Sequence, residues 1–157
     1  MNSMLPNLMG KKMSATHADA TKIMLLEASE DIASKMENTA WQTEPSKNAF
    51  LMTLRDILVP LSELHLRPTA KVVPGWQNPS VDRNAPAGTL FTATAGNSLL
   101  HFAGFDDISK ALGDGRLEAA DLQRSVASAV ENLLAPMQGY FNSSFDWQAA
   151  AAGGYPS

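Results

Sequence analysis

One apolar stripe near the C-terminus constrains the fold of this 157-residue chain more than any other feature. Apolar side chains recur there every three or four residues, which places them on one face of a helix. The stripe consists of Leu122, Val126, Ala129, Val130, Leu133, Met137 and Phe141. This spacing predicts a long helix packed against a core, and it favours helix packing over a cofactor-binding box. Pro136 has no N–H to donate, so we expect it to bend the helix near its end.

Two helices are expected in the first half of the chain, each after a candidate N-cap. Ser29 is the first candidate, and acidic residues follow it in the turn at the positive end of the helix dipole. Ser46 is the second candidate, and the apolar residues after it recur at helical spacing until Pro60, which should end or kink the element. Residues 71–88 are rich in Pro and Gly and predict a surface loop that contains Trp76.

A β-hairpin and a short helix are expected between this loop and the long helix. Strand-forming residues occupy 89–93 and 99–102, and Gly96-Asn97 between them fits a tight turn. Asp106 or Asp107 can cap a helix that runs through Leu112. The expected fold is therefore mainly helical, with one short hairpin.

Composition limits the classes of function. A hydrophobic content of 45% is enough for one compact domain. The net charge is -4, and residues 80–157 hold four basic and eight acidic side chains, so RNA binding would need a local patch or a few specific contacts. The chain has no cysteine for a disulfide or a thiolate metal site, and no apolar run approaches the ~20 residues that span a bilayer. These features favour a soluble intracellular protein.

The segment 10–16 carries residue types that bind nucleotide phosphates. It reads Gly-Lys-Lys-Met-Ser-Ala-Thr, a glycine-led polar stretch with lysine and hydroxyl side chains. Lysine is a compact positive charge, and hydroxyls can donate hydrogen bonds to phosphate oxygens. Taken alone, this short motif also fits a solvated polar loop with ordinary lysines.

Segments around and beyond this loop resemble the eukaryotic and archaeal type of tyrosyl-tRNA synthetase. The similar segments are Met1 to Ser14, Thr21-Lys22-Ile23, Leu117 to Leu122, Val126, Leu133 to Met137 and Gly154-Tyr155-Pro156. Residues 71–88 have no good counterpart. Tryptophanyl-tRNA synthetases are the nearest siblings, and Asp121 together with the Leu-Leu-x-Pro run at 133–136 favours the tyrosyl branch.

The resemblance implies that the chain is the C-terminal portion of a synthetase, from the KMSKS-like loop onward. Residues 1–26 would end a Rossmann-type catalytic domain that is otherwise absent, and residues 27–157 would form a helical anticodon-recognition domain with 71–88 as a loop insertion. His17, His65 and His101 all lack the His-x-Gly-His-like context of the family's catalytic domain. The isolated chain is therefore expected to be inactive.

The resemblance assigns the lysine loop to the phosphates of ATP, which the parent enzyme would use with Mg²⁺. Formation of tyrosyl-adenylate displaces pyrophosphate, and Lys12 would stabilise the charge that builds on the leaving phosphates. Met13 would anchor the loop by packing, and Ala15 stands where the general pattern has a second lysine. The expected ATP-phosphate loop comprises Lys11, Lys12, Met13, Ser14 and Thr16.

The resemblance assigns anticodon reading to Asp121. A carboxylate can accept hydrogen bonds from the Watson–Crick edge of a guanine that has left its stack. Asp121 is also a good cap residue for the long helix, and the two roles are compatible. Glu118-Ala119 replaces a frequent His-Pro, and Thr94 to Asn97 lacks the family's stacking aromatic, which Phe91 or Trp76 could replace only if the loop folds suitably.

The sequence therefore predicts part of a tyrosine–tRNA ligase. The implied partners are tRNA-Tyr, tyrosine and ATP through the catalytic domain, and a second copy in a homodimer or pseudo-dimer, with no membrane and a cytoplasmic location. No tightly bound metal is expected, because His17-x-Asp19 lacks a third ligand. The alternative is a non-catalytic tRNA-binding or assembly module. The acidic C-terminal half and the missing aromatic favour this alternative, and the intact lysine loop argues against it.

Overall fold

The computed structural model describes residues 7–9, 21–24, 27–67 and 77–154, with side chains to residue 150. Its elements are α1 (Ser29–Glu37), α2 (Ala49–Thr53), the π-helical turn η2 (Leu54–Leu58), α3 (Val59–Leu66), β1 (Phe91–Ala95), β2 (Ser98–Phe102), α4 (Phe105–Gly113), α5 (Ala119–Ser143) and α6 (Phe145–Gly154). The described part is thus mainly helical with one two-stranded antiparallel sheet, as the sequence predicts. Within it, no helix is long and apolar enough to cross a membrane.

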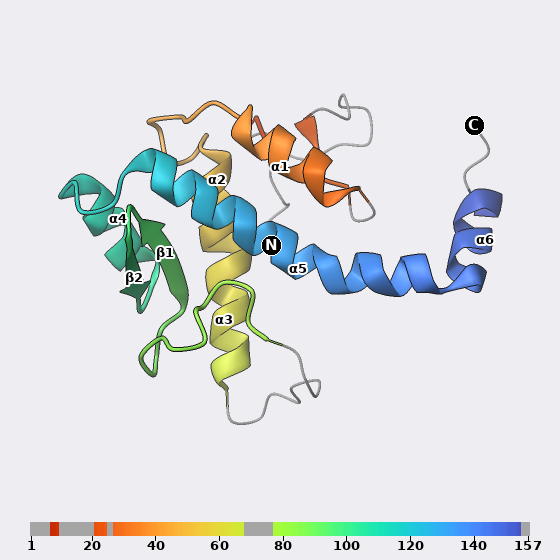
Figure 1. Cartoon of the computed structure of the whole chain (residues 1–157). Coiled ribbons are helices and arrows are strands. Elements are labelled where there is room, and N and C mark those ends of the chain that lie inside the picture. Colours follow the sequence, from red (N-terminus) through yellow and green to blue (C-terminus); the bar gives the residue numbers. More distant parts are fainter. Residues whose placement is uncertain (1–6, 10–20, 25–26, 68–76, 155–157) are drawn as a thin grey trace.

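The first half of α5 forms the centre of the core. Leu122 and Val126 are fully buried, and α5 packs against α1 on one side and β1 on the other (Figure 1). Full burial stops after Val130, and Leu133 and Leu134 are partly buried against the core. The rest of α5 extends beyond the body of the fold, and Met137 is 43% exposed. The predicted stripe therefore packs over only part of its length. Pro136 lies inside the helix, which continues to Ser143.

All three N-caps predicted for the shorter helices are wrong, and two of them are Ser29 and the Asp106 or Asp107 pair. Ser29 is the first residue of α1, and the N-cap is Ala28, which makes no side-chain capping bond. Asp106 and Asp107 lie in the first turn of α4, after an N-cap at Gly104. Acidic residues in a first turn favour the helix through its dipole without capping it, which is why the same residue types suggested caps.

The cap of α2 is Asn48 rather than Ser46. The Asn48 Oδ1 accepts hydrogen bonds from the backbone N–H groups of Phe50 and Leu51, both at 3.0 Å. Its Nδ2 donates to the carbonyl oxygen of Gln42 at 2.7 Å. The side chain of Asn48 is fully buried, so this one amide fixes both the start of α2 and the loop before it.

Pro60 does not end the helical segment, which runs from Ala49 through Leu66. A π-helical turn, Leu54–Leu58, precedes the proline, and α3 begins at Val59. A proline ring clashes with the carbonyl one turn before it in a regular α-helix, and a wider turn relieves that clash. The expected break is replaced by a local change of helix type.

The predicted hairpin is confirmed, with its first strand starting two residues later than expected. Phe91 pairs with Phe102 and Ala95 with Ser98, so Gly96-Asn97 forms a two-residue turn. Gly96 has φ +57°, the left-handed region that glycine adopts without steric cost. The turn has glycine in its first central position, as type II′ hairpin turns do.

Candidate functional site

Asp121 lies in the first turn of α5, beside the tip of the hairpin. The N-cap of α5 is Glu118, so the capping role considered for Asp121 is wrong. Its carboxylate forms an ion pair with Arg124, and the Asp121 side chain is 11% exposed against 74% for Arg124. The ion pair uses Oδ1, and a carboxylate can accept more than one hydrogen bond. Asp121 is therefore held in place by a residue that itself reaches into solvent.

A pocket of about 310 Å³ opens in front of this carboxylate, and we call it the Asp121 pocket. It is lined by Thr94, Gly96, Asp121, Arg124, Ser125 and Ser128. The hairpin is tied to α5 here, because the backbone N–H of Thr94 donates to the Ser125 Oγ at 3.0 Å. The structure thus brings Asp121 next to the 94–97 turn, two segments that the sequence links only through the family resemblance.

The Asp121 pocket has no aromatic lining residue among the described side chains. Phe91 is fully buried in the core, so its proposed use as a stacking surface is wrong. Trp76 lies outside the described residues. Of Asp121, Phe91 and Trp76, the three residues considered for base reading, Asp121 is the one that lines a pocket among the described residues.

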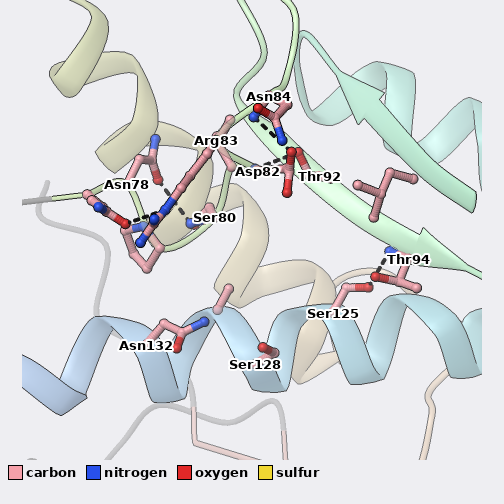
Figure 2. A pocket seen from close by; sticks show the side chains of 15 residues that line it. Asn78, Ser80, Asp82, Arg83, Asn84, Thr92, Thr94, Ser125, Ser128 and Asn132 are labelled. Carbon is pink, nitrogen blue, oxygen red and sulfur yellow. Dashed lines mark hydrogen bonds between the residues drawn. The ribbon is translucent and has the colours of Figure 1, made fainter.

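A larger cleft of about 570 Å³ adjoins the Asp121 pocket, and we call it the polar cleft (Figure 2). Residues 77–84 form one wall, and β1, Leu99 of β2 and α5 form the rest. Thr94, Ser125 and Ser128 line both spaces, so the two are continuous. Sequence reasoning missed this cleft; the available signal was the run of polar residues in 77–84.

The lysine loop residues Lys11, Lys12, Met13, Ser14 and Thr16 lie outside the described residues, but the chain on either side of them is described. The backbone N–H of Leu8 donates to the carbonyl of Thr21 at 2.9 Å, so the two flanks of the segment meet. Lys35 on α1 donates to the carbonyl of Lys22 at 3.0 Å and forms an ion pair with Glu27. These contacts hold the stem of the loop against the helical core.

Among the described residues, no group of three His, Asp or Glu side chains could hold a metal ion. His65 lies in α3, and His101 lies in β2 with its Nδ1 at 3.2 Å from the Thr92 Oγ1. His65 therefore belongs to a helix and His101 to a strand. His17 and Asp19 lie outside the described residues.

Comparison with known proteins was made at the level of sequence and of fold. No family model matches the chain. The cytoplasmic tyrosine–tRNA ligase of Saccharomyces cerevisiae is 28% identical over 159 aligned positions, which cover 99% of this chain and 36% of that protein. The resemblance to tyrosyl-tRNA synthetases is confirmed. The chain spans about a third of the length of this relative.

Solved structures of the same kind of enzyme share the fold. The tyrosyl-tRNA synthetase of Aeropyrum pernix superposes with a TM-score of 0.63 at 20% identity, over 97% of this chain and 38% of that one. The enzyme of Leishmania major in complex with tyrosinol gives 0.62 at 18% identity, over 94% and 20%. The enzyme of Archaeoglobus fulgidus complexed with L-tyrosine gives 0.61 at 17%, over 86% and 34%. The mainly helical fold with its hairpin matches the C-terminal domain of these synthetases.

Proposed function

We propose that this chain is the part of a tyrosine–tRNA ligase that supplies the ATP-phosphate loop and reads the anticodon of tRNA-Tyr. The observation that carries the proposal is the placement of Asp121, a poorly exposed carboxylate facing a pocket between α5 and the hairpin tip. The sequence likeness to a ligase over 99% of the chain supports it independently. The relatives compared above are all synthetases, which favours a ligase over a non-catalytic module.

In this proposal Asp121 accepts hydrogen bonds from the guanine at the first anticodon position. The Watson–Crick edge of guanine presents neighbouring N–H donors, and no other standard base presents the same pair to a carboxylate. Arg124 holds one carboxylate oxygen and, being largely exposed, can also meet the RNA backbone. The net charge of the chain is negative, so general attraction to RNA contributes little. Specificity for guanine then depends on the Asp121 carboxylate.

Lys12 would act on the leaving phosphates of ATP, with Lys11, Ser14 and Thr16 as further contacts and Met13 as a packing anchor. The closed stem at Leu8 and Thr21 suits such a loop, because their backbone bond brings its two ends together and Lys35 of α1 bonds to the neighbouring Lys22. ATP with Mg²⁺ and tyrosine would bind mainly to the catalytic domain. We expect no tyrosine-dependent ATP–pyrophosphate exchange by this chain alone. A cytoplasmic location and a homodimeric or pseudo-dimeric parent complete the proposal.

The test is the affinity of the chain for tRNA-Tyr transcripts with guanine or adenine at the first anticodon position. The wild-type chain should prefer guanine by about 10-fold or more, since a good pair of hydrogen bonds to a base is worth ~1–3 kcal/mol of discrimination. Asp121→Asn should lose most of that preference. The ratio is the relevant quantity, because removing a negative charge also raises non-specific affinity for RNA.

Asp106→Asn is the matched control. Asp106 is an exposed acidic residue in the first turn of α4, away from both cavities. It changes the net charge by the same amount, so it should raise affinity for both transcripts equally and leave the guanine preference intact. A guanine preference that survives in Asp121→Asn, or no binding of tRNA by the wild-type chain, would contradict the proposal.

A further inference from the structure

Glu27 connects the C-terminal flank of the lysine loop, residues 21–24, to the two helices beside it. Its carboxylate forms an ion pair with Lys35 of α1 and accepts the backbone N–H of Met24 at 3.1 Å. Its carbonyl oxygen accepts a hydrogen bond from the side-chain Nε2 of Gln138, in the second half of α5, at 2.7 Å. One residue is thus bonded to the flank of the loop, to α1 and to α5.

Lys35 extends this connection to the flank itself. Its Nζ donates to the carbonyl oxygen of Lys22 at 3.0 Å while it pairs with Glu27. An ammonium group has three N–H donors, so it can hold a carboxylate and a carbonyl at the same time. Lys22 follows Thr21, whose carbonyl accepts the N–H of Leu8 on the other flank. The Glu27–Lys35 pair therefore fixes the place where the two flanks meet.

The Glu27–Lys35 pair is sheltered from solvent. The Lys35 side chain is 18% exposed and the Glu27 side chain is 13% exposed, against 65% and 55% for Lys47 and Glu44 in a surface pair. Exposed pairs are screened by water and hold a structure weakly. A sheltered pair resists separation, because each charge alone would be poorly solvated. The pair is therefore suited to fix a geometry.

We propose that Glu27 and Lys35 are positioning residues for the formation of tyrosyl-adenylate, an inference that rests on the proposed function. In that reaction the tyrosine carboxylate bonds to the α-phosphorus of ATP as the bond to pyrophosphate breaks, and the negative charge passes to pyrophosphate. In the proposed function Lys12 stabilises that charge, and its reach depends on where the flanks of the loop are held. Misplacement of a catalytic group by about 1 Å can lower a rate about 100-fold. Glu27 and Lys35 act through Lys12 and do not touch ATP themselves.

Exchange of the two charges distinguishes positioning from stabilisation alone. An ion pair that only stabilised the fold would work equally well with its charges exchanged. A carboxylate at position 35 cannot donate to the carbonyl of Lys22, and an ammonium at position 27 cannot accept the N–H of Met24. The exchanged pair would therefore keep its attraction and lose its hold on the flank of the loop.

The first test is amide hydrogen exchange in the 157-residue chain. Glu27→Gln removes the charge that holds Lys35, and with it the anchor of the Lys22 carbonyl. Relative to the amide of Val126 in the core of α5, the Leu8 amide should exchange about 10-fold faster or more, the value of a hydrogen bond to a charged group. The ratio is the relevant quantity, because a general loss of stability would speed exchange at both amides.

The second test is tyrosine-dependent ATP–pyrophosphate exchange by the full-length ligase. Glu27→Gln should lower kcat about 10- to 100-fold and change the KM for ATP less than about 3-fold, because the lost interaction is one made in the transition state. Glu27→Lys combined with Lys35→Glu should recover the melting temperature of the wild type without recovering kcat. Full recovery of kcat by this charge exchange would overturn the inference, since the pair would then only stabilise the fold.

Glu44→Gln is the matched control, because it removes the same charge from an exposed ion pair with Lys47. It should behave like the wild type in both tests. If Lys12→Ala lowers kcat and Glu27→Gln does not, the positioning inference fails and the proposed function stands. A wild-type exchange ratio in Glu27→Gln would also overturn the inference. If Lys12→Ala leaves kcat unchanged, the lysine loop is not the phosphate site, and both proposals fail.

Discussion

Asn48→Ala should be among the most destabilising polar substitutions in this chain. The side chain is fully buried and makes three hydrogen bonds, to two backbone N–H groups at the start of α2 and to the carbonyl of Gln42. Alanine makes none of these bonds. The change removes the cap and at the same time releases the loop that precedes it.

The magnitude follows from the burial of each partner. Loss of an asparagine cap costs ~1 kcal/mol on average and up to ~2. The capped N–H groups belong to Phe50 and Leu51, which are 1% and 7% exposed, so water replaces the lost acceptor poorly. Gln42 is exposed, and its carbonyl can bind water instead, which limits that loss to ~1 kcal/mol. Together these terms predict a decrease of about 2–3 kcal/mol in the free energy of unfolding.

Urea denaturation followed by circular dichroism measures this directly. Ser46→Ala is the control, because Ser46 is the cap that the sequence suggests, yet it is exposed and bonds only to Glu44 in the described structure. It should change the free energy of unfolding by less than about 0.5 kcal/mol. The reasoning is refuted if Asn48→Ala costs under 0.5 kcal/mol, or if the two variants are equally destabilised.

Two contrasting pairs of substitutions and one single substitution test other parts of the structure by the same denaturation assay. Gly96→Ala should lower the free energy of unfolding by ~1 kcal/mol, because φ is +57° there. Gly139→Ala should raise it by ~0.5–1 kcal/mol, because Gly139 lies inside α5 with open space around its Cβ position. A change of the same sign in both variants would contradict the backbone described at these two glycines. Leu122→Ala should cost ~2–5 kcal/mol and Met137→Ala less than ~1, since the first is fully buried and the second is 43% exposed. Ser62→Ala should cost ~1–2 kcal/mol, because it leaves the amide that anchors the 77–84 loop without its buried acceptor; an unchanged midpoint would show that this bond is not formed.

Helix and strand positions were predictable where periodicity was long or the turn chemistry was specific. The α5 stripe and the Gly96-Asn97 turn are such signals, and both elements exist. Caps were less predictable, because Ser29, Ser46 and Asp106 are all good cap residues by type. Which polar residue reaches the first N–H groups depends on the incoming loop, and local sequence does not define that path. Asn48 is the cap of α2, and its side chain is held at that position by its bond to the carbonyl of Gln42 in the incoming loop.

The extent of packing along α5 could not be read from its periodicity. A helical stripe gives the direction of an apolar face but not the length over which other elements cover it. In this fold the core covers α5 fully to Val130 and partly to Leu134, and beyond that point apolar side chains such as Tyr140 are exposed. Pro60 is a second case that local sequence does not decide, because a π-helical turn accommodates a residue that normally ends a helix.

The candidate site was predictable in part. The resemblance identified Asp121, but its place beside the hairpin tip depends on how α5 and β1 pack, which involves residues about 30 positions apart, as in the Thr94–Ser125 bond at a separation of 31. The polar run in 77–84 was a signal for the polar cleft, but the cleft itself was missed because its walls come from a loop, a strand and a helix. Neutral serines and asparagines on those elements carry no motif until they face one another.

The most direct measurement of the central claim is the affinity of this chain for tRNA-Tyr transcripts with guanine or inosine at the first anticodon position. Inosine lacks only the exocyclic amine, one of the donors that the Asp121 carboxylate would accept. The account predicts that inosine weakens binding by about 10-fold or more, the value of a hydrogen bond to a charged group, and that Asp121→Asn reduces this difference. Equal affinity of the wild-type chain for the two transcripts would contradict the claim that Asp121 reads the anticodon.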